Sequence, residues 1–266
     1  MNFNLKKSAF TLAETLIVIG IIGVIASLTI PSLSNETNSK EAVTKLKKTQ
    51  AILEDAYGRA EAQYGPLSDW TTVDTNTFTQ RMTGSMKLSK VCSTTAADTG
   101  CFGTLATANF LKPSDGTTAA ALSATTTGKV ILSDESAIAF YIEDANCSKD
   151  VTGGNASLPD LQKVCGSVTV DINGPSKGKS LWGKDLFAFY ITKHGLYPVG
   201  MDGDTKAKFI DNCTKKVPDN GVGTGCTAWV VTNGNMDYAD VNKDTAKCLK
   251  GNTSAVLGWT SQTSCR

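Results

Sequence analysis

The sequence predicts an α+β fold, in which a long amino-terminal helix packs on an antiparallel β-sheet head whose loops are held by disulfides. Three observations predict this fold. An apolar run over residues 10–30 continues into an amphipathic stretch, short apolar or alternating runs follow it, and all eight cysteines come after the apolar run. Strands without long helices between them favour an antiparallel sheet. We expect a leader over residues 1–9, a helix over residues 10–64, half of it transmembrane and half amphipathic, and a globular head over residues 65–266.

The apolar run is long enough to cross a membrane. At about 1.5 Å per residue, a helix over residues 10–30 spans roughly 31 Å, which is close to the thickness of the hydrocarbon core. The run carries one acid, Glu14. An ionised side chain in hydrocarbon costs at least about 2.5–3.5 kcal/mol, so an acid in this place indicates a function. Pro31 follows the run and lacks a backbone N–H, and we expect the helix to bend or loosen there.

The residues around the acid read Ala9-Phe-Thr-Leu-Ala-Glu14. Together with the apolar run that follows them in the chain, these residues resemble the leader and cleavage site of type IV prepilins and of the similar pseudopilins of type II secretion systems. The resemblance implies that a prepilin peptidase cuts between Ala9 and Phe10 and methylates the new amine. It also implies that Glu14 acts in filament assembly and that Pro31 corresponds to the family's helix-bending proline. Ala9 departs from the glycine that is usual at the family's cut site.

An ordinary secretory signal is the alternative explanation of this segment. Lys6 and Lys7, the apolar run and the small residue Ala26 satisfy the rules for a signal peptide cut after Ala26. The length of the run and its acid favour the prepilin interpretation. Under that interpretation the two lysines hold the leader in the cytoplasm. The expected location is the bacterial inner membrane, as a single-pass protein with a periplasmic head, and later a periplasmic or cell-surface filament.

A polar stretch with helical periodicity follows Pro31. Apolar residues recur at steps of three and four, and charged residues fill most of the opposite face. The apolar positions are Val43, Leu46, Leu53, Tyr57, Ala60 and Tyr64. Gly65 and Pro66 predict the end of the helix, because glycine accepts the left-handed cap and proline cannot continue the hydrogen-bond ladder. We expect the apolar stripe to be buried against the sheet.

Alternating and apolar runs predict the strands of the head. The expected strands cover residues 129–132, 137–142, 167–172, 186–192 and 227–232. The four residues from Ser133 to Ser136 join the first two strands as a hairpin. A short helix is expected within residues 75–90. Residues 92–128 are rich in Thr, Ala, Ser and Gly, and we expect them to form loops.

Eight cysteines follow the membrane segment, and we expect them to form disulfides. They are Cys92, Cys101, Cys147, Cys165, Cys213, Cys226, Cys248 and Cys265. An even number of cysteines in an exported domain indicates an oxidising compartment. A zinc site is disfavoured, because no two cysteines form a C-x-x-C pair and His194 is the only histidine. The sequence alone does not choose among the possible pairings, although the short spacings favour sequential neighbours.

A turn in the head contains three candidate oxygen ligands. The segments Asp171-Ile-Asn-Gly174 and Gly183-Lys-Asp185 resemble a loop in the heads of prepilin-type proteins associated with type II secretion. In major pseudopilins of that family a head loop binds calcium, so Asp171, Asn173 and Asp185 are weak calcium candidates. Ordinary turn chemistry explains the same residues, because Asn173 and Gly174 both accept positive φ. We expect no cofactor.

Charge and motifs disfavour several function classes. The chain has 26 basic and 25 acidic residues, and removal of the leader takes away two lysines, so a nucleic-acid partner has no electrostatic basis. No Walker loop, dinucleotide fingerprint or H-E-x-x-H motif is present in the sequence, and we expect no enzymatic activity. The expected function is that of a filament-forming subunit of a type II secretion or type IV pilus system, with prepilin peptidase, other pilin-like subunits and the inner membrane as partners. The competing hypothesis is a membrane-tethered or secreted binding or enzymatic domain with an ordinary anchor or signal peptide.

Overall fold

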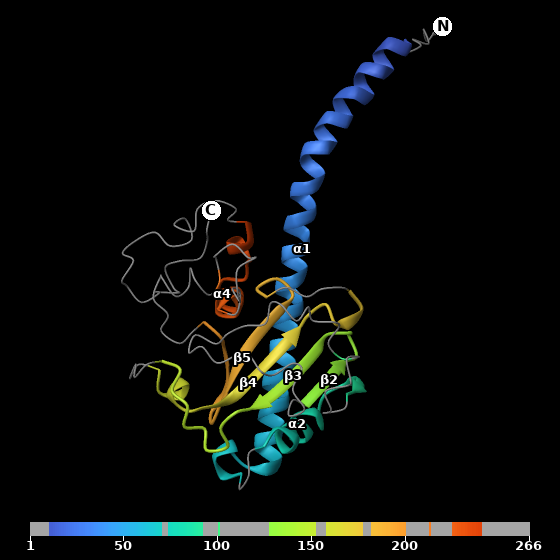
Figure 1. Ribbon diagram of the computed structural model, residues 1–266. Helices are drawn as coiled ribbons and strands as arrows, with labels where there is room; N and C mark the ends of the chain where they lie inside the picture. The colour runs from blue at the N-terminus through green and yellow to red at the C-terminus, as the bar shows by residue number, and fades with distance from the viewer. Residues whose placement is uncertain are drawn as a thin grey trace, which may run out of the picture. The chain divides into compact units, whose positions relative to one another are not determined.

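The computed structural model describes residues 11–70, 74–92, 101, 128–152, 158–177, 182–200, 213 and 225–240, without the side chains of residues 31–35 and 239–240. The chain divides into two compact units, Met1–Glu41 and Ala42–Arg266. Figure 1 labels the main helices and strands. In chain order the described elements are α1 (Leu12–Tyr64), η1 (Leu67–Asp69), α2 (Thr75–Thr83), β1 (Leu88–Val91), β2 (Gly128–Leu132), β3 (Ala137–Ile142), η2 (Pro159–Gln162), β4 (Val164–Asp171), η3 (Pro175–Lys177), β5 (Leu186–Thr192), β6 (Gly195–Pro198), α4 (Cys226–Asn233) and η5 (Asp237–Asp240).

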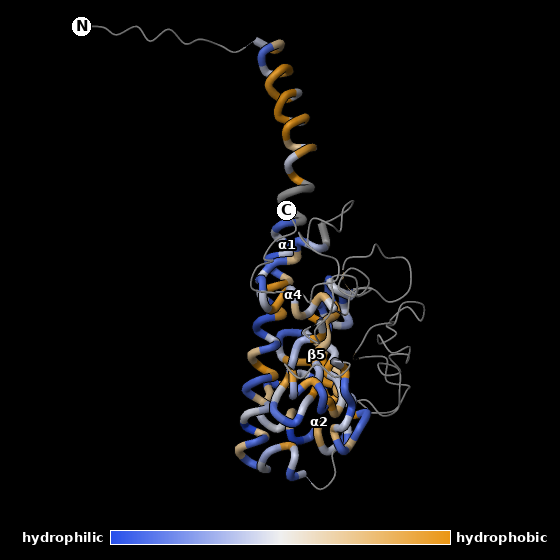
Figure 2. Tube along the Cα trace, turned by 90° about the vertical axis from the view of Figure 1, so that its left-hand side faces the viewer, coloured by the Kyte–Doolittle hydropathy of each residue, from blue (hydrophilic) through white to orange (hydrophobic). Residues whose placement is uncertain are grey.

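Helix α1 contributes residues to both units. It begins at Leu12 and ends at Tyr64, and Gly65 after it adopts φ +80°. This left-handed conformation agrees with the cap that the sequence predicts. Pro31 lies within α1, and the helix continues past it without a break. Figure 2 shows the change of hydropathy along α1, from an almost uniformly apolar first part to alternating polar and apolar residues.

The second unit contains a six-stranded antiparallel sheet with the strand order β1-β2-β3-β4-β5-β6. Each strand pairs with its neighbours in the sequence, so the sheet is a meander. The prediction of an antiparallel sheet is confirmed, and β5 has the predicted bounds. The predicted hairpin turn joins β2 to β3, where the Leu132 N–H donates to the Ser136 carbonyl at 2.8 Å.

The two faces of the sheet carry different side chains, because successive residues of a strand point in opposite directions. One face carries large apolar side chains in cross-strand rows, and all of them belong to the main cluster of buried residues. The rows are Val130–Ile138–Val170–Phe187 and Phe140–Val168–Phe189. The opposite face carries a smaller cluster that includes Ala137, Ala139 and Leu186 together with Cys92 and Cys101. The middle of the sheet is therefore buried on both faces.

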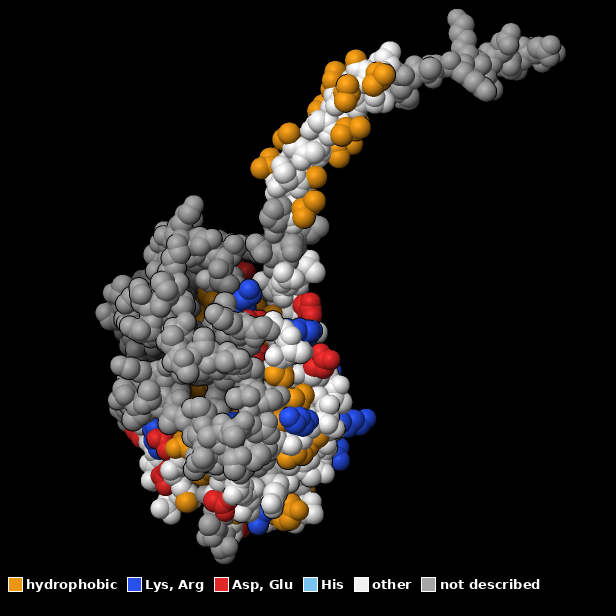
Figure 3. All heavy atoms as spheres, turned by 45° about the vertical axis from the view of Figure 1, so that its right-hand side comes forward, with side chains coloured by type: hydrophobic (Ala, Val, Ile, Leu, Met, Phe, Trp, Pro, Cys, Tyr) orange, Lys and Arg blue, Asp and Glu red, His pale blue; other side chains and the backbone are white. Residues whose placement is uncertain are grey.

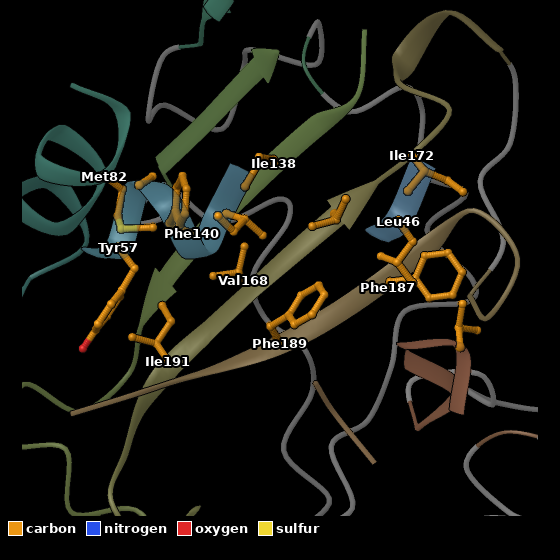
Figure 4. Close-up of a cluster of buried hydrophobic side chains, with 14 of the residues drawn as sticks. Leu46, Tyr57, Met82, Ile138, Phe140, Val168, Ile172, Phe187, Phe189 and Ile191 are labelled. Carbon is orange, nitrogen blue, oxygen red and sulfur yellow. The ribbon is translucent and has the colours of Figure 1, made fainter. Parts of the chain in front are cut away.

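Several residues from the second part of α1 belong to the main cluster, and they include most of the predicted stripe. They are Val43, Leu46, Leu53, Ala56, Tyr57 and Ala60. Figure 4 shows Leu46 and Tyr57 among the side chains of that cluster. Where the predicted stripe is interrupted at Gln50, the buried residue is Thr49, whose hydroxyl donates to the Lys45 carbonyl at 3.0 Å. A hydroxyl that bonds to its own helix can be buried without leaving an unsatisfied polar group.

Helix α2 is shorter than the predicted helix within residues 75–90. It ends at Thr83, and the chain then forms β1, which the sequence analysis did not predict. Gly84 follows the last helical residue, and its N–H donates to the Gln80 carbonyl at 3.1 Å. The start of β2 lies close to α2: a Cβ on Gly128 would meet the Thr79 hydroxyl oxygen at 1.9 Å. Only glycine fits at residue 128 without a shift of the helix.

The strand predicted over residues 227–232 is wrong, because residues 226–233 form α4. The run of Thr, Trp and Val residues there is typical of a strand, but long-range contacts decide the conformation. Next to α4, the Ala188 N–H of β5 donates to the Thr227 hydroxyl at 3.0 Å, and the Ala228 N–H donates to the Val199 carbonyl at 3.0 Å. Gly234 ends α4 in the left-handed region, with φ +65°. That glycine cap is the local signal that indicates a helix here.

Three disulfides are present among the described residues, and each joins neighbouring cysteines. They are Cys92–Cys101, Cys147–Cys165 and Cys213–Cys226. These pairs agree with the sequential pairing that the spacings favour. Cys248 and Cys265 lie outside the described residues.

Candidate functional site

The amino-terminal end of α1 contains Glu14, the acid on which the sequence interpretation depends. The Thr11 N–H and the Thr11 hydroxyl each donate to Glu14 Oε2 at 2.8 Å. In return, the Glu14 N–H lies 3.3 Å from the Thr11 hydroxyl oxygen. This reciprocal arrangement is a capping box, in which the residue before the helix and the third helical residue satisfy each other's free N–H groups.

The sequence analysis missed this capping box, although the signal is present in the chain. Thr11-Leu-Ala-Glu14 has the S/T-x-x-E spacing immediately before an apolar run. The carboxylate therefore has hydrogen-bond donors within its own chain. It also lies in the first turn, where the helix dipole favours a negative charge. Ala9 and Phe10, the predicted processing site, lie outside the described residues.

The apolar part of α1, Leu12–Ile30, is long and apolar enough to cross a membrane, a test that a cleaved signal sequence also passes. Its large side chains are exposed in all directions, from 52% at Val18 to 81% at Leu12. Figure 3 shows these apolar side chains along the helix. A helix that is apolar all round requires an apolar environment, either lipid or other protein.

Every polar side chain of this apolar part forms a hydrogen bond with a residue of α1 or with Thr11, which directly precedes it. Besides Glu14, they are the hydroxyls of Thr15, Ser27 and Thr29. These donate to the carbonyl oxygens of residues 12, 24 and 25 at 2.9, 2.8 and 3.0 Å, respectively. A hydroxyl that bonds to its own helix leaves no unsatisfied donor in hydrocarbon. Apart from the charge of Glu14, the segment can therefore be surrounded by lipid at little polar cost.

The three weak calcium candidates lie together, and they bond to one another and to the backbone. The buried Asp171 carboxylate accepts the Asn173 N–H at 3.0 Å and the Gly174 N–H at 3.1 Å. The Asn173 side-chain amide donates to the Asp185 carboxylate. Within the described ranges, no group of three or more His, Cys, Asp or Glu residues could hold a metal ion. These contacts are those of an ordinary turn, and calcium binding stays a prediction.

The end of the head at Tyr64 contains a group of aromatic side chains that the sequence analysis did not single out. Trp70 is held by its indole N–H, which donates to the Gly65 carbonyl at 3.0 Å. Its ring lies 6.4 Å from the Tyr64 ring and 6.1 Å from the Phe78 ring, between centroids. Arg81 places its guanidinium carbon 4.0 Å from the Trp70 centroid and 4.6 Å from the Tyr64 centroid. The Trp70 and Tyr64 rings stand at 80° to each other, and both contact this cation.

Comparison with family models, with curated proteins and with solved structures found no match to this chain. The resemblance to prepilins therefore depends on the residues around Ala9 and Glu14. The geometry adds two observations at that end of the chain: Glu14 caps α1, and the helix that follows it is apolar on every side.

Proposed function

We propose that this chain is a filament-forming, pilin-like subunit of a type II secretion or type IV pilus system. Residues 12–30 anchor it in the bacterial inner membrane until it is assembled. The observation that carries the proposal is the amino-terminal helix itself, apolar all round and exposed, with a single carboxylate in its first turn. Lipid tails and neighbouring apolar helices are nearly equivalent surroundings for such a surface. The same helix can therefore lie in the membrane before assembly and in the core of a filament after it.

The second part of α1 connects this anchor to the head in our proposal. Its stripe shares a cluster of buried side chains with the strands, and we propose that this part of the helix packs on the sheet. Because α1 runs from Leu12 to Tyr64, one helix contributes residues both to the anchor and to the head. The bond from Tyr57 towards the carbonyls of Thr192 and Lys193, at 3.3 and 3.2 Å, supports a fixed position of the helix.

Glu14 sets the register between subunits in this proposal. The capping box gives its carboxylate hydrogen bonds but no opposite charge. A charge in low dielectric is stabilised mainly by an opposite charge. Cleavage between Ala9 and Phe10 by prepilin peptidase creates an amine at Phe10, and the amine of one subunit pairs with Glu14 of the next.

Filament yield in strains that express Glu14 variants tests the role of the acid. Glu14→Gln keeps an acceptor for the Thr11 N–H and removes the charge, whereas Glu14→Ala removes both. We expect both variants to insert into the membrane normally and to assemble poorly. Thr15→Val is the matched control, because it removes a polar group from the same turn without changing the charge. Normal filament yield from Glu14→Ala would refute the assembly role.

The mature amino terminus distinguishes this proposal from the two alternatives. Mass spectrometry of the exported protein is expected to find a methylated Phe10 at the terminus. A terminus at Ser27 would establish an ordinary signal peptide. An intact Met1 would leave a membrane-tethered domain, for which the length and composition of Leu12–Ile30 are equally suitable.

A further inference from the structure

The inference concerns Asn173 and Gly174, which lie in the connection between β4 and β5. Gly174 adopts φ +71°, and a Cβ on it would meet the Glu135 carbonyl oxygen at 1.9 Å. The close approach of the turn between β2 and β3 therefore requires glycine at residue 174. Because an asparagine precedes it, the connection contains the dipeptide in which asparagine loses ammonia most readily. No side chain on the second residue shields the backbone nitrogen that attacks the amide.

Deamidation at this dipeptide needs only the chain and water. The Gly174 nitrogen attacks Asn173 Cγ, a new C–N bond closes a succinimide ring, and the bond from Cγ to Nδ2 breaks. The Gly174 nitrogen gives its proton to hydroxide, and the Nδ2 group takes up a proton from water and leaves as ammonia. A second water molecule then opens the ring at either carbonyl, which leaves aspartate or isoaspartate at residue 173.

The fold holds both of the nitrogen atoms that react. The Gly174 N–H donates to Asp171 Oδ1 at 3.1 Å, and the Asn173 side-chain amide donates to the Asp185 carboxylate. Asp171 is fully buried and Asp185 is 8% exposed, so water competes little for these hydrogen bonds. The Ile172 N–H also joins the two sides of the connection, because it donates to the Asp185 carbonyl at 3.0 Å. Attack on Cγ therefore requires a local opening in which both nitrogen atoms leave their acceptors.

The product of the reaction does not fit the closed connection. A carboxylate at residue 173 has acceptors where the amide has donors, so it cannot replace the hydrogen bond to Asp185. It also adds a negative charge beside the Asp185 carboxylate in surroundings that are largely buried, where like charges repel strongly. Isoaspartate in addition lengthens the backbone by one carbon atom, which displaces the Gly174 N–H from Asp171.

We propose that Asn173 is a modification site that records opening of the connection between β4 and β5. In the closed head the amide is retained. In a head that opens at this point the amide is lost, and the connection does not close again. The inference goes beyond the proposed function and holds whether or not the chain assembles into filaments.

The first experiment follows deamidation of the full-length protein in detergent micelles at mildly alkaline pH, by peptide mapping with mass spectrometry. Isoaspartate at residue 173 identifies the succinimide route, because direct hydrolysis of the amide gives aspartate alone. We expect Asn173 to react at least about tenfold more slowly in the folded protein than in the same chain unfolded in guanidinium, the factor that one hydrogen bond to a charged group supplies. Equal rates, or a faster reaction in the folded protein, would overturn the proposal.

The second experiment removes the acceptor of the Asn173 amide with Asp185→Ala. We expect deamidation about tenfold faster at Asn173 in the folded variant and an unchanged rate at Asn233. Asn233 is the internal control, because it also precedes a glycine, whose N–H donates to the Val230 carbonyl at 2.9 Å instead of to a carboxylate. An unchanged rate at Asn173 would overturn the proposal. An equal rise at Asn233 would also overturn it, since the whole head would then be looser.

The unfolding midpoint shows whether the Asp185→Ala head is folded. If it is not, Asp171→Asn takes its place with the same expectations. This variant keeps an acceptor oxygen near the Gly174 N–H but removes the charge, and hydrogen bonds to an ionised acceptor are roughly twice as strong as those to a neutral one.

The third experiment tests whether the product keeps the connection open. Asn173→Asp supplies the product directly, and Asn173→Ser is the matched control, because it loses the amide without adding a charge. We expect the Gly174 amide hydrogen to exchange at least about tenfold faster in Asn173→Asp than in Asn173→Ser. Equal exchange in the two variants would refute the claim that deamidation prevents closure.

Discussion

The two parts of α1 belong to one helix, but their polar groups are satisfied in opposite ways. In the apolar part, the hydroxyls of Thr15, Ser27 and Thr29 donate to carbonyls three or four residues earlier. In the amphipathic part, Lys48 pairs with Asp134 at 2.7 Å, and Tyr57 reaches the end of β5. The hydroxyls of the first part therefore find their acceptors within the same helix. Polar groups of the second part bond to residues more than eighty positions away in the chain. This difference means that mutations in the two parts should affect different properties.

The largest expected effect comes from a matched pair of truncations. Phe140 is fully buried, and Phe140→Ala should lower the free energy of unfolding of the head by about 3–5 kcal/mol. Ile21→Ala, in the exposed apolar part, should leave it unchanged. All four tryptophans lie beyond residue 64, so fluorescence during guanidinium unfolding reports on the head alone. An equal loss from Ile21→Ala would show that the apolar part also contributes to the stability of the head.

The disulfides offer a second test of this difference, because every cysteine follows the apolar part of α1. Replacing Cys147 and Cys165 together by alanine should destabilise the head by about 3 kcal/mol, mainly by enlarging the unfolded ensemble. The helicity of residues 12–30 should not change. Peptide mapping without reduction gives the pairing, and midpoints of unfolding with and without reductant give the stabilisation. Eight free thiols in the exported protein would contradict this prediction.

Loss of the capping box is expected to have an intermediate and local effect. Thr11→Ala should cost about 1 kcal/mol at the start of α1, because the hydroxyl that accepts from the Glu14 N–H and donates to the Glu14 carboxylate is lost. Faster hydrogen exchange of the amides of residues 12–15 is the measurement. Thr15→Ala, which removes a hydroxyl bonded to Leu12 alone, is the control. A change in the unfolding midpoint of the head would show that the two parts are more strongly coupled than we propose.

The smallest effect concerns pH and the contact between Lys48 and Asp134. Burial raises the pKa of the Asp134 carboxyl, but hydrogen bonds from Lys48 and Ser136 outweigh it and leave the pKa lowered. A carboxyl with a lowered folded-state pKa stabilises the fold above its unfolded pKa, near 3.9, and this contribution is lost as the pH falls through the folded value. Lys48→Gln should reduce the stability of the head by about 0.5 kcal/mol at pH 7 and by less at pH 2. An equal loss at both pH values would exclude the ion pair as its cause.

The parts of the fold that the sequence predicts are those in which local pattern and tertiary burial agree. The apolar run over residues 186–192 predicts β5 with its observed bounds, and the spacing of the α1 stripe predicts most of the buried positions of the second part of α1. In α4, the strand-like composition disagrees with the contacts of Thr227 and Ala228, and the contacts decide. The short strand β6 (Gly195–Pro198) has too few residues for its alternation to be distinguished from a turn.

One candidate site could also have been predicted from local sequence, and the other depends on contacts between distant residues. The T-x-x-E spacing around Glu14 lies within four residues, so local reasoning could have predicted the capping box. The contacts of Arg81 with Trp70 and Tyr64 join residues from α1, α2 and the segment between them. No spacing in the chain indicates that the Trp70 and Tyr64 rings will both contact one guanidinium, because that depends on how α2 folds back beside α1.

The strand order of the sheet has a consequence for the order in which the head folds. Beyond the long segment between β1 and β2, each described strand pairs with the described strand that precedes it in the chain. The three described disulfides close short loops, with separations of 9, 18 and 13 residues. Contacts between near neighbours form quickly, because little loop entropy has to be lost first. The amphipathic part of α1 precedes every described strand, so its apolar stripe is available as each of these strands is added. If the chain is exported amino terminus first, as the proposed function implies, we expect the sheet to form one strand at a time, with each of the three described disulfides closing soon after its second cysteine has left the membrane.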